Sequence, residues 1–214
     1  MATNFPTSVD VLTNPVSNDS LNSPSHSAQH ANANDAIEAV EDYLLNGAGK
    51  TGLVYLSSFS ATSGSTLVCN NAFNSTYTNY HLVVAFRAAT NSQGITMTLG
   101  ASATNYYYGV MGIPSLTGNA LVRYGSGVTT TSSAFIGLGC AGGNNTSGFY
   151  GITNPNVATQ TSWNIQAGNS EANNGLGPTV GGAWHTLSTA YTDFTLTLVT
   201  GTITSLKVDV YGYK

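Results

Sequence analysis

The sequence predicts a mainly β protein, in which an extended N-terminal arm and one α-helix precede an antiparallel β-sandwich similar to a jelly roll. Three observations support this fold class. From Leu53 onward, short runs of β-branched and aromatic residues alternate with clusters of Gly, Asn and Ser, which is typical of β-sandwiches. Residues 25–46 have helical periodicity. Residues 5–24 carry three prolines and only isolated apolar residues.

Residues 1–24 form the predicted arm. Turn-forming residues separate its apolar side chains, so this segment cannot build a core of its own. We expect its apolar side chains to fill grooves on a neighbouring protein and to anchor the chain there. The expected anchoring residues are Phe5, Val9, Leu12 and Leu21.

The helix is predicted over residues 25–46, with Ser25 or Ser27 as N-cap and Asn46-Gly47 as the stop. Residues at alternating spacings of four and three form a heptad seam, which one helix cannot bury alone. We expect a homotrimer or another partner surface to cover it. The seam consists of His26, His30, Ala33, Ile37, Val40 and Leu44.

The two seam histidines do not match a metalloprotease helix, because Ser27 stands where that motif has its general-base glutamate. In a parallel trimer, His26 and His30 would ring the axis and could hold an anion, a water or a metal. Alternatively, they form local hydrogen bonds or contact the partner. No metal site is therefore assigned from the sequence.

Residues 47–52 read as a hinge and residues 53–214 as the β-sandwich domain. Residues 194–199 and 206–211 alternate apolar and polar side chains, and we expect them to pair as a half-buried antiparallel hairpin. The strands are expected at residues 53–59, 66–69, 80–87, 95–99, 106–111, 120–124, 134–138, 148–152, 162–167, 184–187, 194–199 and 206–211.

The composition excludes several classes of function. Only 7% of the residues are charged, against roughly 25% in ordinary globular proteins. No basic stripe favours nucleic acid or an anionic membrane, and no apolar run is long enough to cross a bilayer. Cys69 and Cys140 are too few for a zinc cluster. We expect two buried free thiols, with a disulfide as the alternative.

No catalytic set is visible, so we expect no enzyme activity and no cofactor. The motif G-x-S-x-G is absent, and the β domain has only Glu171, Asp193 and Asp209 as carboxylates. We expect His81 and His185 to be packed or rim residues. Exposed aromatic and amide side chains remain as candidates for surface recognition of a host glycan or a protein, namely Asn144, Asn145 and Trp184.

One stretch resembles an N-terminal module that recurs in structural proteins of tailed bacteriophages. It runs from Phe5 to Leu45, FPTSVDVLTNPVSNDSLNSPSHSAQHANANDAIEAVEDYLL, with FP, TNP, DSL and HSAQHANANDAIEA as its pattern. FNSTYTNYHLVV at residues 73–84 and GTITSLKVDVYGYK at residues 201–214 are similar to parts of the same phage proteins. The resemblance implies a virion component, often trimeric, of the head fibre, tail fibre or minor structural type.

The order of the segments narrows this expectation. Only residues 47–52 separate the helix from the β domain, where a long fibre would have a shaft. We therefore expect a capsid decoration (cement) protein or a short head fibre, bound to the major capsid protein or another virion protein. The alternative is a tail fibre tip that attaches the phage to its host. Because MATNFPTSVD lacks a secretory signal, we expect assembly in the host bacterial cytoplasm and a place on the virion surface.

Overall fold

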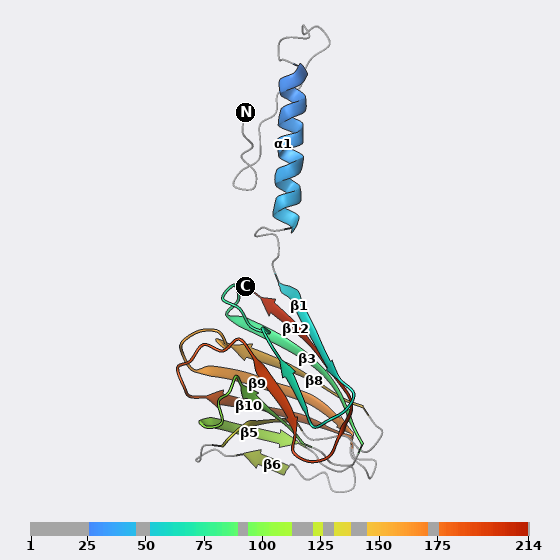
Figure 1. Cartoon of the computed structure of the whole chain (residues 1–214), viewed down its shortest axis with the longest axis vertical. Helices are drawn as coiled ribbons and strands as arrows, with labels where there is room; N and C mark the ends of the chain where they lie inside the picture. Colours follow the sequence, from blue (N-terminus) through green and yellow to red (C-terminus); the bar gives the residue numbers. More distant parts are fainter. Residues whose placement is uncertain are drawn as a thin grey trace. The chain divides into compact units, whose positions relative to one another are not determined.

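The computed structural model describes residues 26–45, 52–89, 94–112, 122–125, 131–137, 145–170 and 176–213. The chain divides into two compact units, Met1–Gly52 and Leu53–Lys214. Helix α1 (His26–Leu45) is the described part of the first unit, and the β domain makes up the second (Figure 1). The predicted arm of residues 1–24 and most of the predicted hinge lie outside the described residues.

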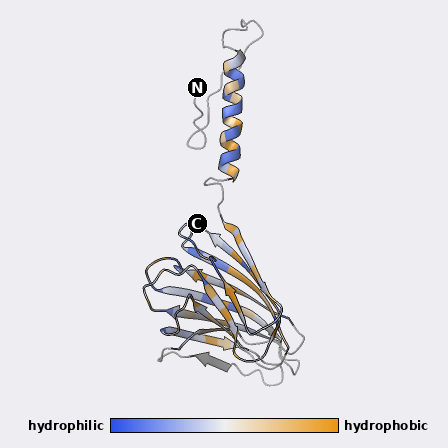
Figure 2. Ribbon diagram, viewed as in Figure 1, coloured by the Kyte–Doolittle hydropathy of each residue, from blue (hydrophilic) through white to orange (hydrophobic). Residues whose placement is uncertain are grey.

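Helix α1 confirms the helix that the sequence predicts. Its sequence, HSAQHANANDAIEAVEDYLL, contains five alanines, and alanine is the strongest helix former. Apolar residues are interspersed with polar ones along its length (Figure 2). Ile37, Val40 and Leu44 are spaced three and four residues apart, so they lie on one side of the helix.

The β domain contains strands close to the positions that alternation predicts. Within the described residues they are β1 (Leu53–Ala61), β2 (Thr66–Cys69), β3 (Asn79–Ala88), β4 (Ile95–Leu99), β5 (Tyr106–Gly112), β6 (Val122–Gly125), β7 (Ala134–Gly137), β8 (Thr146–Thr153), β9 (Thr161–Ser170), β10 (Leu176–His185), β11 (Phe194–Leu198) and β12 (Ile203–Tyr213).

These strands form two antiparallel sheets. The large sheet has eight strands in the order β1-β12-β3-β8-β9-β10-β5-β6, and the small sheet has four in the order β2-β11-β4-β7. In Figure 1 the strands of the large sheet follow one another from β1 to β6. The predicted mainly β, sandwich-like fold is confirmed.

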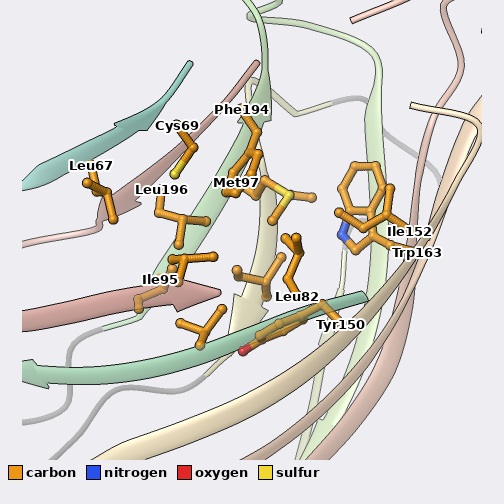
Figure 3. Close-up of a cluster of buried hydrophobic side chains, with 14 of the residues drawn as sticks. Leu67, Cys69, Leu82, Ile95, Met97, Tyr150, Ile152, Trp163, Phe194 and Leu196 are labelled. Carbon is orange, nitrogen blue, oxygen red and sulfur yellow. The ribbon is translucent and has the colours of Figure 1, made fainter. Parts of the chain in front are cut away.

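The core lies between the two sheets. Side chains alternate along each strand, so one face of each sheet points inward. Cys69, Met97 and Phe194 of the small sheet lie opposite Leu82 and Ile152 of the large one (Figure 3). The largest fully buried side chains are Tyr80, Tyr106, Phe73, Phe194, Leu82, Met97, Leu99, Ile136, Ile152, Ile165, Leu196 and Ile203.

The predicted C-terminal hairpin is wrong. Strand β11 pairs with β2 and β4 in the small sheet, whereas β12 pairs with β1 and β3 in the large sheet. The connection between them crosses from one sheet to the other, with Gly201 in the left-handed region (φ 88°). Both strands present alternating apolar side chains to the same core from opposite sides, so their pattern is that of a hairpin although they do not pair.

The predicted strand at residues 184–187 is also misplaced, because β10 runs from Leu176 to His185. Its sequence LGPTVGGAWH contains glycine and proline, which have low strand propensity and mark turns. Pairing with β9 on one side and β5 on the other overrides this local preference. Trp184 therefore lies near the end of a central strand, rather than at the start of one.

Candidate functional site

The heptad seam of α1 is exposed in the part of the chain that the structure describes. Ile37 is 57% exposed and Leu44 63% exposed, and Val40 is exposed as well. His30 and Ala33 also lie on the exposed side, whereas the His26 side chain is outside the described residues. Contiguous exposed apolar side chains are typical of a surface that binds another protein. The predicted anchoring residues Phe5, Val9, Leu12 and Leu21 lie outside the described residues.

His185 is a fully buried residue on the inner face of β10. Its Nε2 lies 2.8 Å from Ser102 Oγ. Its ring packs against Tyr106, with centroids 4.4 Å apart, and against Tyr191 at 5.3 Å. The expectation that His185 is a packed residue is confirmed.

The Ser102–His185 pair has the atoms of a nucleophile and a base, but its surroundings favour a structural role. A catalytic histidine is normally oriented by a third group, whereas His185 Nδ1 has no hydrogen-bond partner among the described residues. Burial lowers the pKa of His185 and so favours the neutral ring, an effect that the Thr104 carbonyl opposes. The pair ties the β4–β5 connection to β10.

Two of the three carboxylates that the sequence offers have local structural roles. Asp193 Oδ1 accepts a hydrogen bond from the backbone N of Asn71 at 2.6 Å, and Asn71 has a left-handed φ of 54°. Asp209 forms a 2.8 Å ion pair with Lys207, and the hydrogen bonds from Lys207 and Ser58 lower the pKa of Asp209. Glu171 lies outside the described residues. In the described part of the chain, no three His, Cys, Asp or Glu side chains are grouped as metal ligands would be.

Cys69 is a free, fully buried thiol on β2. Burial raises its pKa to about 12, because the low dielectric of the core disfavours the thiolate. The prediction of a buried free thiol is confirmed for Cys69, and Cys140 lies outside the described residues.

The candidate recognition residues do not form one site. Trp184 is 52% exposed on the outer face of β10, directly across from Tyr107 of β5. On its other side Trp184 pairs with Ser162 of β9, which in turn pairs with Thr153, the last residue of β8. Asn145 is exposed just before the first residue of β8, about 26 Å from Thr153 along an extended strand. Asn144 lies outside the described residues.

The outer face of the large sheet brings together side chains that the sequence did not single out. Phe149 of β8 is 50% exposed, and Asn164 and Gln166 of β9 are exposed beside it. The ring of His81 stacks on Phe149 at 5.7 Å. The alternation of side chains shows from the sequence that Phe149 faces outward on β8 and that Asn164 and Gln166 face outward on β9. It does not show that β8 and β9 are neighbours, which depends on the strand order of the sheet.

None of the helices in the described part of the chain has the length and hydropathy that crossing a membrane requires. Comparison with protein-family models, with curated proteins and with solved structures gives no match. The function is therefore inferred from the residues and their arrangement.

Proposed function

We propose that the chain is a structural protein of a bacteriophage virion, a capsid decoration (cement) protein or short head fibre. In this role the N-terminal segment docks on the particle and the β-sandwich is displayed outward. The observation that carries the proposal is the seam of α1, in which Ile37, Val40 and Leu44 are all exposed. The resemblance of residues 5–45 to a phage structural module agrees with it.

The core of the β domain is complete without the helix. The sandwich buries its own apolar side chains between its two sheets. Most of the stability of a helix in a protein comes from packing of its apolar side against other parts, rather than from helix propensity. We therefore expect partner helices or the surface of another protein to cover the exposed seam of α1.

A parallel homotrimer fits the residue types of the seam. Ile37 and Leu44 fall at a positions and Val40 at a d position, and Ala33 is small enough to let helices approach. In this arrangement the helices join three chains, and residues 1–24 bind the major capsid protein or another virion protein. Assembly takes place in the host bacterial cytoplasm.

An add-back experiment tests the proposed attachment. Purified full chain is added to phage particles that lack it, beside a variant without residues 1–24. The full chain should bind saturably, to hundreds of copies per particle, whereas the truncated chain should stay in solution with its β domain folded. A truncated chain that still decorates particles contradicts the proposal, and so does a full chain that does not bind.

A second candidate function is that of a tail fibre tip that contacts the host surface. The exposed Trp184 and Phe149 on the outer face of the large sheet favour it, because exposed aromatic side chains are frequent in binding sites. Copy number separates the two functions. A decoration protein is present in hundreds of copies per virion, and a tail tip in a few or in tens.

A further inference from the structure

We propose that the outer face of the large sheet carries a groove that binds a neutral oligosaccharide. This inference rests on the second candidate function, surface recognition, and names its site and its ligand class. The groove crosses β3, β8, β9, β10 and β5, which are consecutive neighbours in the sheet.

The floor of the groove is a row of five residues that cross-strand pairing aligns, and three of the five are glycines. Cross-strand pairing aligns His81, Gly151, Asn164, Gly182 and Gly109. A Cβ added at Gly151 or at Gly109 would meet nothing within 4 Å, so the space above the backbone there is open. The line spans four strand spacings, about 19 Å. That length suits a chain of sugars rather than a single one.

Two neighbouring register lines form the walls. One contains Trp184, paired with Tyr107. The other contains Phe149, which aligns through Gln166 with Val180. The two lines lie four residues apart on each strand, which separates their Cα atoms by about 13 Å. An aromatic ring thus stands on each side of the glycine-containing floor.

The chemistry of these side chains matches that of a sugar. A pyranose has apolar C–H faces, which pack on aromatic rings such as those of Trp184 and Phe149. It also has hydroxyl groups, which pair with the exposed amides of Asn164 and Gln166. A few polar groups placed among aromatic ones are typical of small-molecule sites.

The scarcity of charge favours a neutral ligand. Strands β5, β8, β9 and β10 contain no Asp, Glu, Lys or Arg, and β3 has one charged residue, Arg87, on its outer face six positions from the floor residue His81. Two charged residues align with Phe149 in the cross-strand register, but on strands outside the groove. Asp209 lies on β12, next to β3, and Arg123 lies on β6, next to β5. An ionised ligand would lose its hydration here with no opposite charge on these four strands, whereas a neutral sugar loses only the smaller hydration of its hydroxyl groups, which hydrogen bonds to amides can replace.

The distribution of polar groups argues against a second copy of the chain as the occupant. Protein interfaces have an apolar centre and a polar rim. This face has the reverse order, since the amides of Asn164 and Gln166 lie at the centre, on β9, and the rings of Phe149 and Trp184 lie on the flanking strands. A second copy would bury these amides without assured partners.

Binding is tested with the purified full chain and a panel of linear neutral oligosaccharides of glucose, mannose, galactose and N-acetylglucosamine. Titration calorimetry measures affinity, and tryptophan fluorescence reports on the groove because Trp163 is 2% exposed and Trp184 is 52% exposed. We expect saturable binding by at least one oligosaccharide, protection of Trp184 from acrylamide quenching, and little change between low and high salt.

A pair of matched variants tests the position of the site. Gly151→Val fills the floor, and Gly168→Val places the same side chain on the outer face of β9, outside the groove. A Cβ at either position meets nothing within 4 Å, and valine favours strands, so both variants should fold. Gly151→Val should weaken binding by about tenfold or more, as should Trp184→Ala, whereas Gly168→Val should bind like the wild type.

Three results overturn the groove. The first is that no oligosaccharide of the panel binds, and the second is that Gly151→Val and Gly168→Val bind with equal affinity. The third is that Gly151→Val, but not Gly168→Val, dissociates an oligomer whose stability sugars do not change, because the face would then serve self-association. Each result concerns the purified chain, so each leaves the virion function to be decided by the add-back experiment and the copy number.

Discussion

The hydroxyl of Tyr80 binds both backbone groups of Asn74. It accepts a hydrogen bond from Asn74 N at 2.7 Å and donates one to Asn74 O at 2.6 Å. The Tyr80 ring is fully buried on β3 and contacts Phe73 and Tyr77 edge-on, with centroids 4.8 and 6.1 Å apart. One buried side chain thus ties the β2–β3 connection to the core.

Replacing Tyr80 with phenylalanine should lower the free energy of unfolding by about 1–3 kcal/mol, because it leaves both backbone groups of Asn74 without their partner. Urea unfolding of the full chain measures the change. Tyr55→Phe is the control, since Tyr55 is exposed on β1 and its change should be within about 0.5 kcal/mol. Equal stabilities for the two variants would show that the Tyr80 hydroxyl does not hold this connection.

Two adjacent glycines of β10 should differ sharply in their tolerance of a methyl group. A Cβ at Gly181 would collide with the carbonyl oxygen of Gly109 and lie 2.8 Å from the Cα of Val110, both on β5. A Cβ at Gly182 would meet only the Trp163 carbonyl oxygen, at 3.4 Å. Backbone atoms cannot move aside without breaking the pairing of β10 with β5.

Gly181→Ala should therefore destabilise the domain by roughly 1–3 kcal/mol or more, and Gly182→Ala by less than about 1 kcal/mol. Thermal unfolding followed by circular dichroism compares the two variants with the wild type. A Gly181→Ala variant as stable as Gly182→Ala would mean that β5 does not approach β10 so closely.

Most of the strands and the helix were predictable because they have a local signature, whereas β10 (Leu176–His185) was misplaced because its glycines and proline mark turns. Alternation locates a strand such as β4 (Ile95–Leu99) at its observed bounds, and the heptad spacing locates α1. Alternation also shows which side chains face the core, but it does not show which strand lies alongside. This limit explains the wrong hairpin, since β11 and β12 satisfy the same pattern from different sheets.

The outer-face groove was not predictable for the same reason. Gly151 and Gly182 are 31 positions apart in the sequence and lie on one line only because β9 pairs with both β8 and β10. The sequence singles out Trp184 as an exposed aromatic residue, but at the start of a predicted strand over residues 184–187. Its partners in the groove depend on pairing, which no local signal encodes.

His185 should make the domain less stable at acid pH. Burial lowers the pKa of His185 in the folded state. Below about pH 6.5, the ordinary histidine pKa, His185 is therefore protonated in the unfolded chain while it stays neutral in the folded chain. Stability is therefore complete above that pH and is lost as the pH falls from about 6.5 toward the folded-state pKa.

Urea midpoints of the wild type and of His185→Gln, measured from pH 7.5 to 5, test this coupling. Glutamine keeps an amide that can pair with Ser102 Oγ but does not titrate. The wild-type midpoint should fall more steeply with acid than that of the variant. Parallel pH profiles would show that His185 is protonated as readily in the folded chain as in the unfolded one.

The seam of α1 gives the last prediction, on oligomeric state. Ile37→Asp combined with Val40→Asp places two carboxylates on each helix of the proposed trimer, where three chains would bring six together without counter-charges. Sedimentation at micromolar concentration should show trimers for the wild type and monomers for this variant.

Ala31→Asp combined with Ala39→Asp is the matched control. Both positions lie off the seam on the same helix, so the added charge is the same and the loss of helix propensity is similar or larger. The control variant should remain a trimer, because only the seam variant puts charge at the helix contact. Because the β domain is a separate compact unit, its circular dichroism should be unchanged in both variants. Monomeric wild type would contradict the trimer, and the exposed Ile37, Val40 and Leu44 would then be assigned to a contact with another virion protein.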